Sequence, residues 1–269
     1  MAGHCLPRAW RTRGGKMPTR STPWPNGTPC WIDYGASDVK AAEDFYGSLF
    51  GWEFEDSGAE FATYHLATKN GEQVCGFAPL STPEDSPAWT TYLAADDVEA
   101  AAERIRQAGG SVVVEPMDLG PIGKMLIALD SDGSGLGVWQ AGERTGVRLY
   151  NEPGSLIWNE AILEDPVSAR KFYSAVFGHT FDKASDGEGH ATFAVDGSPA
   201  GGVGGRESGL PRGWLVCFAT GSVEETAAKA EAAGGKVTAG RVDTHVGRLA
   251  VLEDPWGGAF SVVQAPTGN

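Results

Sequence analysis

The chain contains one stretch of sequence twice. Residues 27–55 read GTPCWIDYGASDVKAAEDFYGSLFGWEFE, and residues 154–182 read GSLIWNEAILEDPVSARKFYSAVFGHTFD. An internal repeat of this kind predicts two domains built on one plan. The identical pairs are Gly27/Gly154, Trp31/Trp158, Asp38/Asp165, Ala42/Ala169, Phe45/Phe172, Tyr46/Tyr173, Phe50/Phe177, Gly51/Gly178 and Phe54/Phe181.

Each copy predicts a strand, a helix and a second strand. Residues 30–36 alternate in chemistry, as a half-buried strand does. Asp38 and Asp165 are typical helix N-cap residues, and Gly51 and Gly178 are typical of the residue that ends a helix. Between them, apolar residues recur at i, i+3, i+4, i+7 and i+8, so each helix is expected to bury an aromatic face. These residues are Ala42, Phe45, Tyr46, Leu49 and Phe50, then Ala169, Phe172, Tyr173, Val176 and Phe177.

Further strands and a second helix follow each copy. In the first half, strands are expected at 60–67 and 73–80, then at 89–95, 111–115, 124–129 and 136–140, with a helix starting after Asp97. The same order recurs in the second half. The sequence therefore predicts an α+β protein in which each domain pairs two βαβββ units. The expected division is a flexible N-terminal segment at 1–26, domains at 27–141 and 154–265, and a linker at 142–153.

The charge balance excludes several classes of partner. The 269 residues include 35 acidic and 21 basic ones, for a net charge of −14. Nucleic acids and anionic membranes bind basic surfaces, so neither is expected as a partner. A cationic ligand is compatible with this charge, although surface acid also simply favours solubility. No apolar run is long enough to span a bilayer, and residues 1–16 lack the apolar segment of a secretory signal, so a cytoplasmic location is expected.

The motif D-[VP]-x(5)-FY-x(3)-FG resembles the first helix of the vicinal oxygen chelate superfamily. The turns 130–133 (DSDG) and 254–257 (DPWG) resemble the turn that precedes its last strand. This superfamily includes glyoxalases, extradiol dioxygenases, fosfomycin-resistance enzymes and bleomycin-binding proteins. The tandem arrangement is similar to two-domain glyoxalase-like proteins. The resemblance implies that each domain forms a half-open barrel of curved sheet, with helices outside and a ligand cavity inside.

Metal-dependent relatives hold a divalent ion with His, Glu or Gln side chains on inner strands, but the matching positions here carry other residues. A divalent ion needs several oxygen or imidazole donors together. We therefore expect no metal and no other cofactor. The ligand positions fall on Trp31, Thr90 and Gly137 in the first domain and on Trp158, Leu215 and Ser261 in the second. The histidines that miss them are His4, His65, His179, His190 and His245.

A tryptophan and a carboxylate share one face of each first strand. Side chains two apart point the same way, so Trp31 accompanies Asp33, and Trp158 accompanies Glu160. If this face lines the cavity, each domain presents an aromatic plane beside an acid/base candidate, Asp33 or Glu160. Either tryptophan can equally be core filling, and either carboxylate can lie at a solvated rim. Further ligand-binding candidates are Tyr64, Trp89, Tyr92, Trp139, His190, Phe193 and Trp214.

These features favour a metal-free glyoxalase-like protein that binds a hydrophobic or aromatic small molecule, as in secondary-metabolite tailoring or resistance. A homodimer is one assembly open to it. The alternative is a metal-dependent lyase, isomerase or dioxygenase of the same superfamily. A third interpretation is an interaction scaffold made of two barrels packed together. For the metal-dependent alternative, the donors to consider are His65, Glu72, His190, His245 and Glu253.

Overall fold

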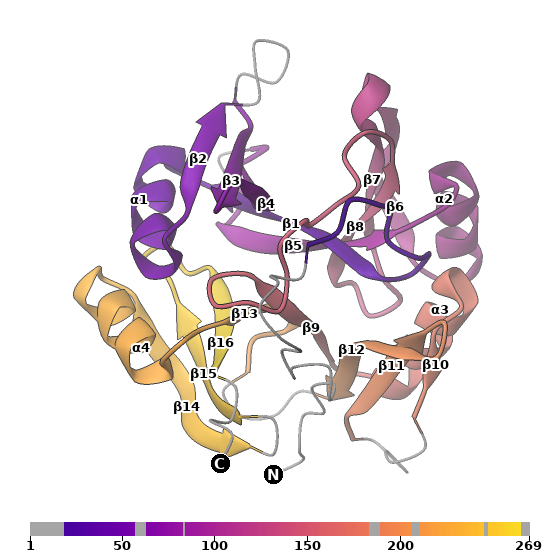
Figure 1. Cartoon of the computed structure of the whole chain (residues 1–269). Helices are drawn as coiled ribbons and strands as arrows, with labels where there is room; N and C mark the ends of the chain where they lie inside the picture. Colours follow the sequence, from indigo (N-terminus) through magenta and orange to yellow (C-terminus); the bar gives the residue numbers. More distant parts are fainter. Residues whose placement is uncertain are drawn as a thin grey trace.

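The computed structural model describes residues 19–56, 63–82, 84–182, 189–205, 210–244 and 247–264. Within these residues the chain forms two eight-stranded sheets and four α-helices (Figure 1). Domain 1 comprises β1 (Pro29–Ala36), α1 (Val39–Phe50), β2 (Glu53–Asp56), β3 (His65–Lys69), β4 (Glu72–Pro79), β5 (Ala88–Ala94), α2 (Val98–Gln107), β6 (Ser111–Asp118), the 3₁₀ turn η3 (Gly120–Ile122), β7 (Gly123–Leu129) and β8 (Gly135–Ala141).

Domain 2 repeats this order of elements. It comprises β9 (Leu156–Leu163), α3 (Pro166–Phe177), β10 (Thr180–Phe181), β11 (Ala191–Val195), β12 (Ser198–Gly205), β13 (Gly213–Ala219), α4 (Val223–Ala232), β14 (Lys236–Thr244), β15 (Gly247–Glu253) and β16 (Ala259–Gln264). None of the helices that the structure describes is long and apolar enough to cross a membrane.

Both sheets have the same topology, and the first strands of their two βαβββ units meet at the centre. The strand order is β2-β3-β4-β1-β5-β8-β7-β6 in domain 1 and β10-β11-β12-β9-β13-β16-β15-β14 in domain 2. β1 runs parallel to β4 and antiparallel to β5, which in turn runs parallel to β8. The predicted α+β fold of paired βαβββ units is confirmed, and each sheet stays open rather than closing into a barrel.

The first helix of each domain begins and ends where the sequence predicts. The Asp38 side chain accepts a hydrogen bond from the Ala41 backbone N–H, and Asp165 does the same for Ser168. Gly51 and Gly178 end the helices with φ of 70° and 76°, in the left-handed region that favours glycine. Local capping chemistry therefore sets where these two helices begin and end.

The aromatic faces of these helices are buried between the domains. In Figure 1, α1 lies beside α4, and α3 lies beside α2, so each helix contacts the other domain. Phe50 of α1 lies 4.8 Å from Phe218 of β13, measured between ring centroids, and Phe45 lies 6.1 Å from Trp256. Two apolar clusters, one around α1 and one around α3, therefore each contain residues of both domains.

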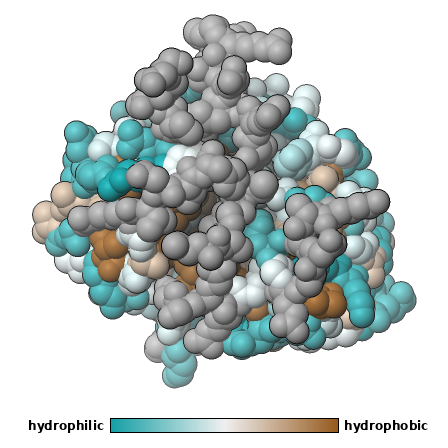
Figure 2. Space-filling view, turned by 90° about the horizontal axis from the view of Figure 1, so that it is seen from below, coloured by the Kyte–Doolittle hydropathy of each residue, from teal (hydrophilic) through white to brown (hydrophobic). Residues whose placement is uncertain are grey.

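Paired hydrogen bonds also link the two domains. The Trp52 indole N–H donates to the carbonyl oxygen of Gly154 at 2.7 Å. The buried imidazole of His179, at the equivalent position of domain 2, has its Nε2 2.7 Å from the carbonyl oxygen of Gly27. In each domain a ring N–H thus bonds the backbone carbonyl of the first residue of the other copy of the repeat. Where Figure 2 shows described residues, hydrophilic residues surround smaller hydrophobic areas.

Candidate functional site

A cavity of about 120 Å³ lies on the face of the domain 1 sheet opposite α1. Strand alternation creates this division, because Tyr34 of β1 packs against Tyr46 of α1 whereas Trp31 and Asp33 point away from that helix. The lining residues are Trp31, Asp33, Tyr64, Tyr92, Leu119, Ile122, Met125, Trp139 and Arg144. The structure therefore brings together Asp33 and four of the aromatic residues that the sequence analysis singled out.

The Asp33 carboxylate holds the aromatic walls in place. Its Oδ1 accepts hydrogen bonds from Trp31 Nε1, at 2.7 Å, and from the Tyr64 hydroxyl, and the Tyr92 hydroxyl also bonds the carboxylate. Burial raises the pKa of Asp33, and these donors together with the Arg144 charge oppose that rise. Burial and the Asp33 charge raise the pKa of Tyr64 and Tyr92 well above the usual value, so both phenols keep their protons.

Arg144 covers one side of the cavity. Its guanidinium carbon lies 5.8 Å from the centroid of the Trp31 ring and 5.5 Å from that of Tyr64, within the range of a cation–π contact. Its backbone carbonyl accepts a hydrogen bond from Trp139 Nε1 at 2.9 Å. Arg144 forms no ion pair with any acid in the described part of the chain. Sequence reasoning missed this residue because it belongs to the expected linker, where no periodic pattern predicts which way a side chain points.

Two glycines provide the space in which these rings lie. A Cβ at Gly76 would lie 1.9 Å from the Tyr64 hydroxyl oxygen and 2.4 Å from Asp33 Oδ1. A Cβ at Gly137 would lie 2.1 Å from the Tyr92 ring. Gly137 is also one of the positions where the sequence resemblance places a metal ligand of metal-dependent relatives. In this chain that position forms the surface against which Tyr92 packs.

Domain 2 has a different set of polar groups at the equivalent place. Trp158 Nε1 donates to Glu160 Oε2 at 2.9 Å, which repeats the Trp31–Asp33 contact. The other carboxylate oxygen, Oε1, lies 2.5 Å from His190 Nε2, and both side chains are largely buried. The strand position paired with Trp158 is Cys217, whereas the residue paired with Trp31 is Tyr92. Burial raises the pKa of the Cys217 thiol to about 12, so this thiol stays neutral.

Three predicted ligand-binding residues lie on the opposite, helix-facing side of the sheets. Trp89 Nε1 donates to the Tyr46 hydroxyl at 3.0 Å, and Trp214 Nε1 donates to the Tyr173 hydroxyl at 2.9 Å. Phe193 stacks on His179 with ring centroids 4.1 Å apart. The expectation that these three rings line the cavities is thus corrected, because strand alternation directs them into the core.

The donors present do not fit the divalent ion of metal-dependent relatives. Nowhere in the described residues do three His, Cys, Asp or Glu side chains converge. Near Trp31 the single carboxylate of Asp33 is already engaged by ring donors, and in domain 2 Glu160 and His190 form only a pair.

The alternative donors are dispersed over the molecule. His65 Nδ1 lies 2.5 Å from Glu43 of α1, on the helix-facing side. Glu72 pairs with Arg148 at 2.7 Å, and Glu253 pairs with Lys236 at 2.6 Å. His245 lies outside the described residues.

The chain thus has two open sheets of paired βαβββ units, and each sheet carries polar groups on the face opposite its helices. This arrangement defines a class of proteins with two ligand cavities in tandem. Comparison with known families identifies the class. Residues 30–138 match the model of the Glyoxalase/Bleomycin resistance protein/Dioxygenase superfamily, and residues 161–263 match that of the glyoxalase-like domain. The chain belongs to this superfamily, which confirms the resemblance noted in its sequence motifs.

Curated relatives match along nearly the whole chain. CFP32 of Mycobacterium tuberculosis, whose name assigns it provisionally to the glyoxylases, is 40% identical over 257 residues, covering 92% of this chain and 98% of CFP32. The anthracycline biosynthesis protein DnrV of Streptomyces peucetius is 33% identical over 264 residues, covering 90% of this chain and 94% of DnrV. DauV of Streptomyces sp. strain C5, also named as an anthracycline biosynthesis protein, is 34% identical, covering 88% of this chain and 93% of DauV.

Solved structures share the fold at low sequence identity. The Mn(II)-bound glyoxalase from Novosphingobium aromaticivorans aligns with a TM-score of 0.63 at 17% identity, covering 90% of this chain and 83% of that one. The 2,3-dioxygenase LapB from Pseudomonas sp. KL28 aligns with a TM-score of 0.62 at 12% identity, covering 89% and 93%. At these identities the likeness concerns the fold alone.

Proposed function

We propose that the domain 1 cavity binds an aromatic ring of a small molecule without the help of a metal ion. The observation that carries this proposal is the closed set of four aromatic side chains around one carboxylate, with a guanidinium at the edge. An apolar cavity of about 150 Å³ holds one benzene molecule. A cavity of about 120 Å³ therefore suits a single ring, and the remainder of a larger ligand extends outward.

The polar groups define which ring fits best. A ring that stacks on Trp31 gains about 0.5–1.5 kcal/mol beyond its burial. An acidic oxygen on that ring, such as a phenol or carboxylate, would meet the Arg144 guanidinium. If the protein also transforms its ligand, Asp33 is the acid/base group, because burial raises its pKa toward the range in which a carboxylate both accepts and returns a proton.

The names of the relatives support an aromatic ligand. DauV and DnrV are named for anthracycline biosynthesis, and anthracyclines are fused-ring aromatic molecules. By this proposal, one end of such a ring system enters the domain 1 cavity. In domain 2, Trp158, Glu160 and His190 form the second, smaller set of candidate groups, with Glu160 beside His190 as the acid/base pair.

Calorimetric titration with the one-ring probe 4-hydroxybenzoate tests the proposal. Trp31→Leu is expected to weaken binding at least tenfold, because it removes the stacking surface. Trp256→Leu makes the same change at a half-buried position that lines neither candidate site, and it should alter the affinity for this probe by less than about twofold. Equal affinities for the wild type and Trp31→Leu, with both proteins folded, would contradict a binding role for this cavity.

A further inference from the structure

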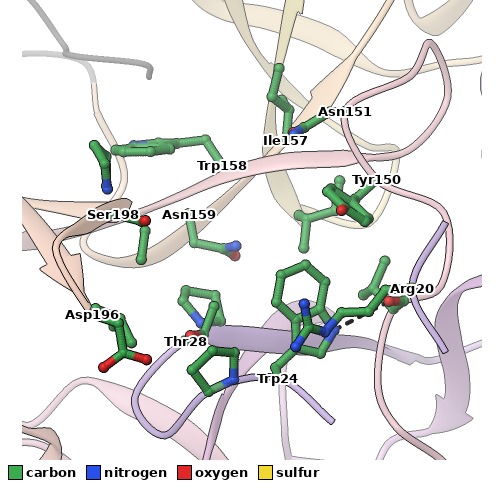
Figure 3. A pocket seen from close by; sticks show the side chains of 17 residues that line it. Arg20, Trp24, Thr28, Tyr150, Asn151, Ile157, Trp158, Asn159, Asp196 and Ser198 are labelled. Carbon is green, nitrogen blue, oxygen red and sulfur yellow. Dashed lines mark hydrogen bonds between the residues drawn. The ribbon is translucent and has the colours of Figure 1, made fainter. Parts of the chain in front are cut away.

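A second and larger hollow lies where the two domains and the N-terminal segment meet (Figure 3). Its volume is about 640 Å³, compared with about 120 Å³ for the domain 1 cavity. Small-molecule sites usually measure about 300–1,000 Å³ and often lie at domain interfaces. This interdomain crevice is therefore large enough to enclose a molecule of several fused rings.

Aromatic side chains form the walls of the crevice, and contacts with neighbouring residues hold Trp24 in position. Trp24 meets Tyr150 edge to face at 5.2 Å between centroids, and its indole Nε1 donates to the Val147 carbonyl at 3.2 Å. The Arg20 guanidinium lies 4.8 Å from the Trp24 ring centroid. Figure 3 shows Trp158 on the opposite side of the crevice from Trp24. A flat ligand in the crevice would stack on the Trp24 indole.

A buried amide projects between these walls. Asn159 is only 2% exposed, and its Oδ1 accepts a hydrogen bond from the Thr91 hydroxyl at 2.9 Å. Its Nδ2 has no hydrogen-bond partner among the residues that the structure describes, and Figure 3 shows the end of the side chain within the crevice. The Nδ2 atom is open to the crevice, so an acceptor on a ligand can take the place of water as its hydrogen-bond partner.

We propose that the interdomain crevice binds a planar polycyclic molecule through one of its carbonyl oxygens. The carbonyl accepts a hydrogen bond from Asn159 Nδ2 while the rings stack on Trp24. Asp196 and Ser198, at the rim, bind hydroxyl or amino substituents of the same molecule. The crevice and the domain 1 cavity share no lining residue, so this proposal stands independently of the first one.

Fluorescence titration with 1,4-dihydroxyanthraquinone tests the crevice. The titration uses the full chain carrying Ile122→Trp, which narrows the domain 1 cavity and thereby isolates binding elsewhere. Adding Ser198→Trp places a bulky side chain at an exposed rim position, and it should weaken binding at least tenfold without disturbing the core. Asn159→Leu removes the amide donor and should weaken binding about fivefold to tenfold.

Thermal melts of each variant establish that it is folded before affinities are compared. Loss of binding in both crevice variants, with the Ile122→Trp protein still binding, supports the proposal. Unchanged affinity in the folded Ser198→Trp protein overturns it. Failure of the Ile122→Trp protein to bind the anthraquinone while the wild type binds it also overturns the proposal, and would assign the molecule to the domain 1 cavity instead.

Discussion

The hydroxyl of Tyr46 in domain 1 donates a hydrogen bond to the buried carboxylate of Asp254 in domain 2, over 2.7 Å. The reverse contact has the same length, from Tyr173 in domain 2 to Asp130 in domain 1. Each tyrosine comes from the repeated Phe-Tyr pair, and each aspartate opens the turn before the last strand of its domain. The two motifs of the repeat therefore meet across the domain interface.

Tyr46→Phe tests this contact. The Tyr46 hydroxyl also accepts a hydrogen bond from Trp89 Nε1, so its removal leaves this buried indole N–H without a partner, whereas Asp254 keeps the Tyr34 hydroxyl. We expect the free energy of unfolding to fall by about 1–3 kcal/mol in urea denaturation. Tyr150→Phe is the control, because the Tyr150 hydroxyl bonds no described residue, and its effect should stay within about 0.5 kcal/mol. Equal stabilities of the two variants would show that the contact contributes little.

His179 makes stability depend on pH. Burial lowers its pKa from 6.5 to about 4. Between these values the unfolded chain takes up a proton that the folded chain does not, so the free energy of unfolding falls as the pH falls. From pH 7 to pH 5 the loss due to this group is about 2 kcal/mol. His179→Gln should lose correspondingly less in urea denaturation at the two pH values. The same loss in both proteins would assign the pH dependence to other groups.

Gly76→Ala should disrupt the domain 1 cavity. The added methyl group would overlap the Tyr64 hydroxyl and Asp33, which must then separate. We expect a loss of about 2 kcal/mol or more in stability, together with loss of 4-hydroxybenzoate binding. Gly135→Ala is the matched control, because a Cβ there meets no atom within 4 Å. Retention of both properties by Gly76→Ala would mean that the Tyr64–Asp33 contact is dispensable.

Divalent ions should bind weakly, if at all. The donor set at the family's ligand positions lacks the converging imidazole and carboxylate groups that a divalent ion requires. Addition of Mn²⁺, Fe²⁺, Ni²⁺ or Zn²⁺ is expected to shift the melting temperature by less than about 1 °C. A stoichiometric metal in protein purified without chelator, measured by elemental analysis, would contradict this prediction and favour the metal-dependent alternative.

The candidate site could be predicted in part. Alternation along β1 correctly placed Trp31 and Asp33 on one face, because side-chain direction in a strand is local. Trp89 and Tyr92 were both expected at the cavity, yet they lie an odd number of positions apart and therefore point to opposite faces of β5. Closer attention to this parity would have excluded Trp89. Arg144 offered no such signal, since a loop residue has no fixed period.

The sequence by itself determined the duplication, the order of strands and helices, and the caps of α1 and α3. These features depend on hydrogen bonds and periodicities within a few residues of chain. Only the tertiary structure decided what covers the aromatic face of each helix. The hydrophobic effect is not directional. The pattern of Phe45, Tyr46 and Phe50 therefore predicted that this helix face is buried, but it did not predict that the other domain buries it. The interdomain crevice likewise exists only because the domains pack in this way.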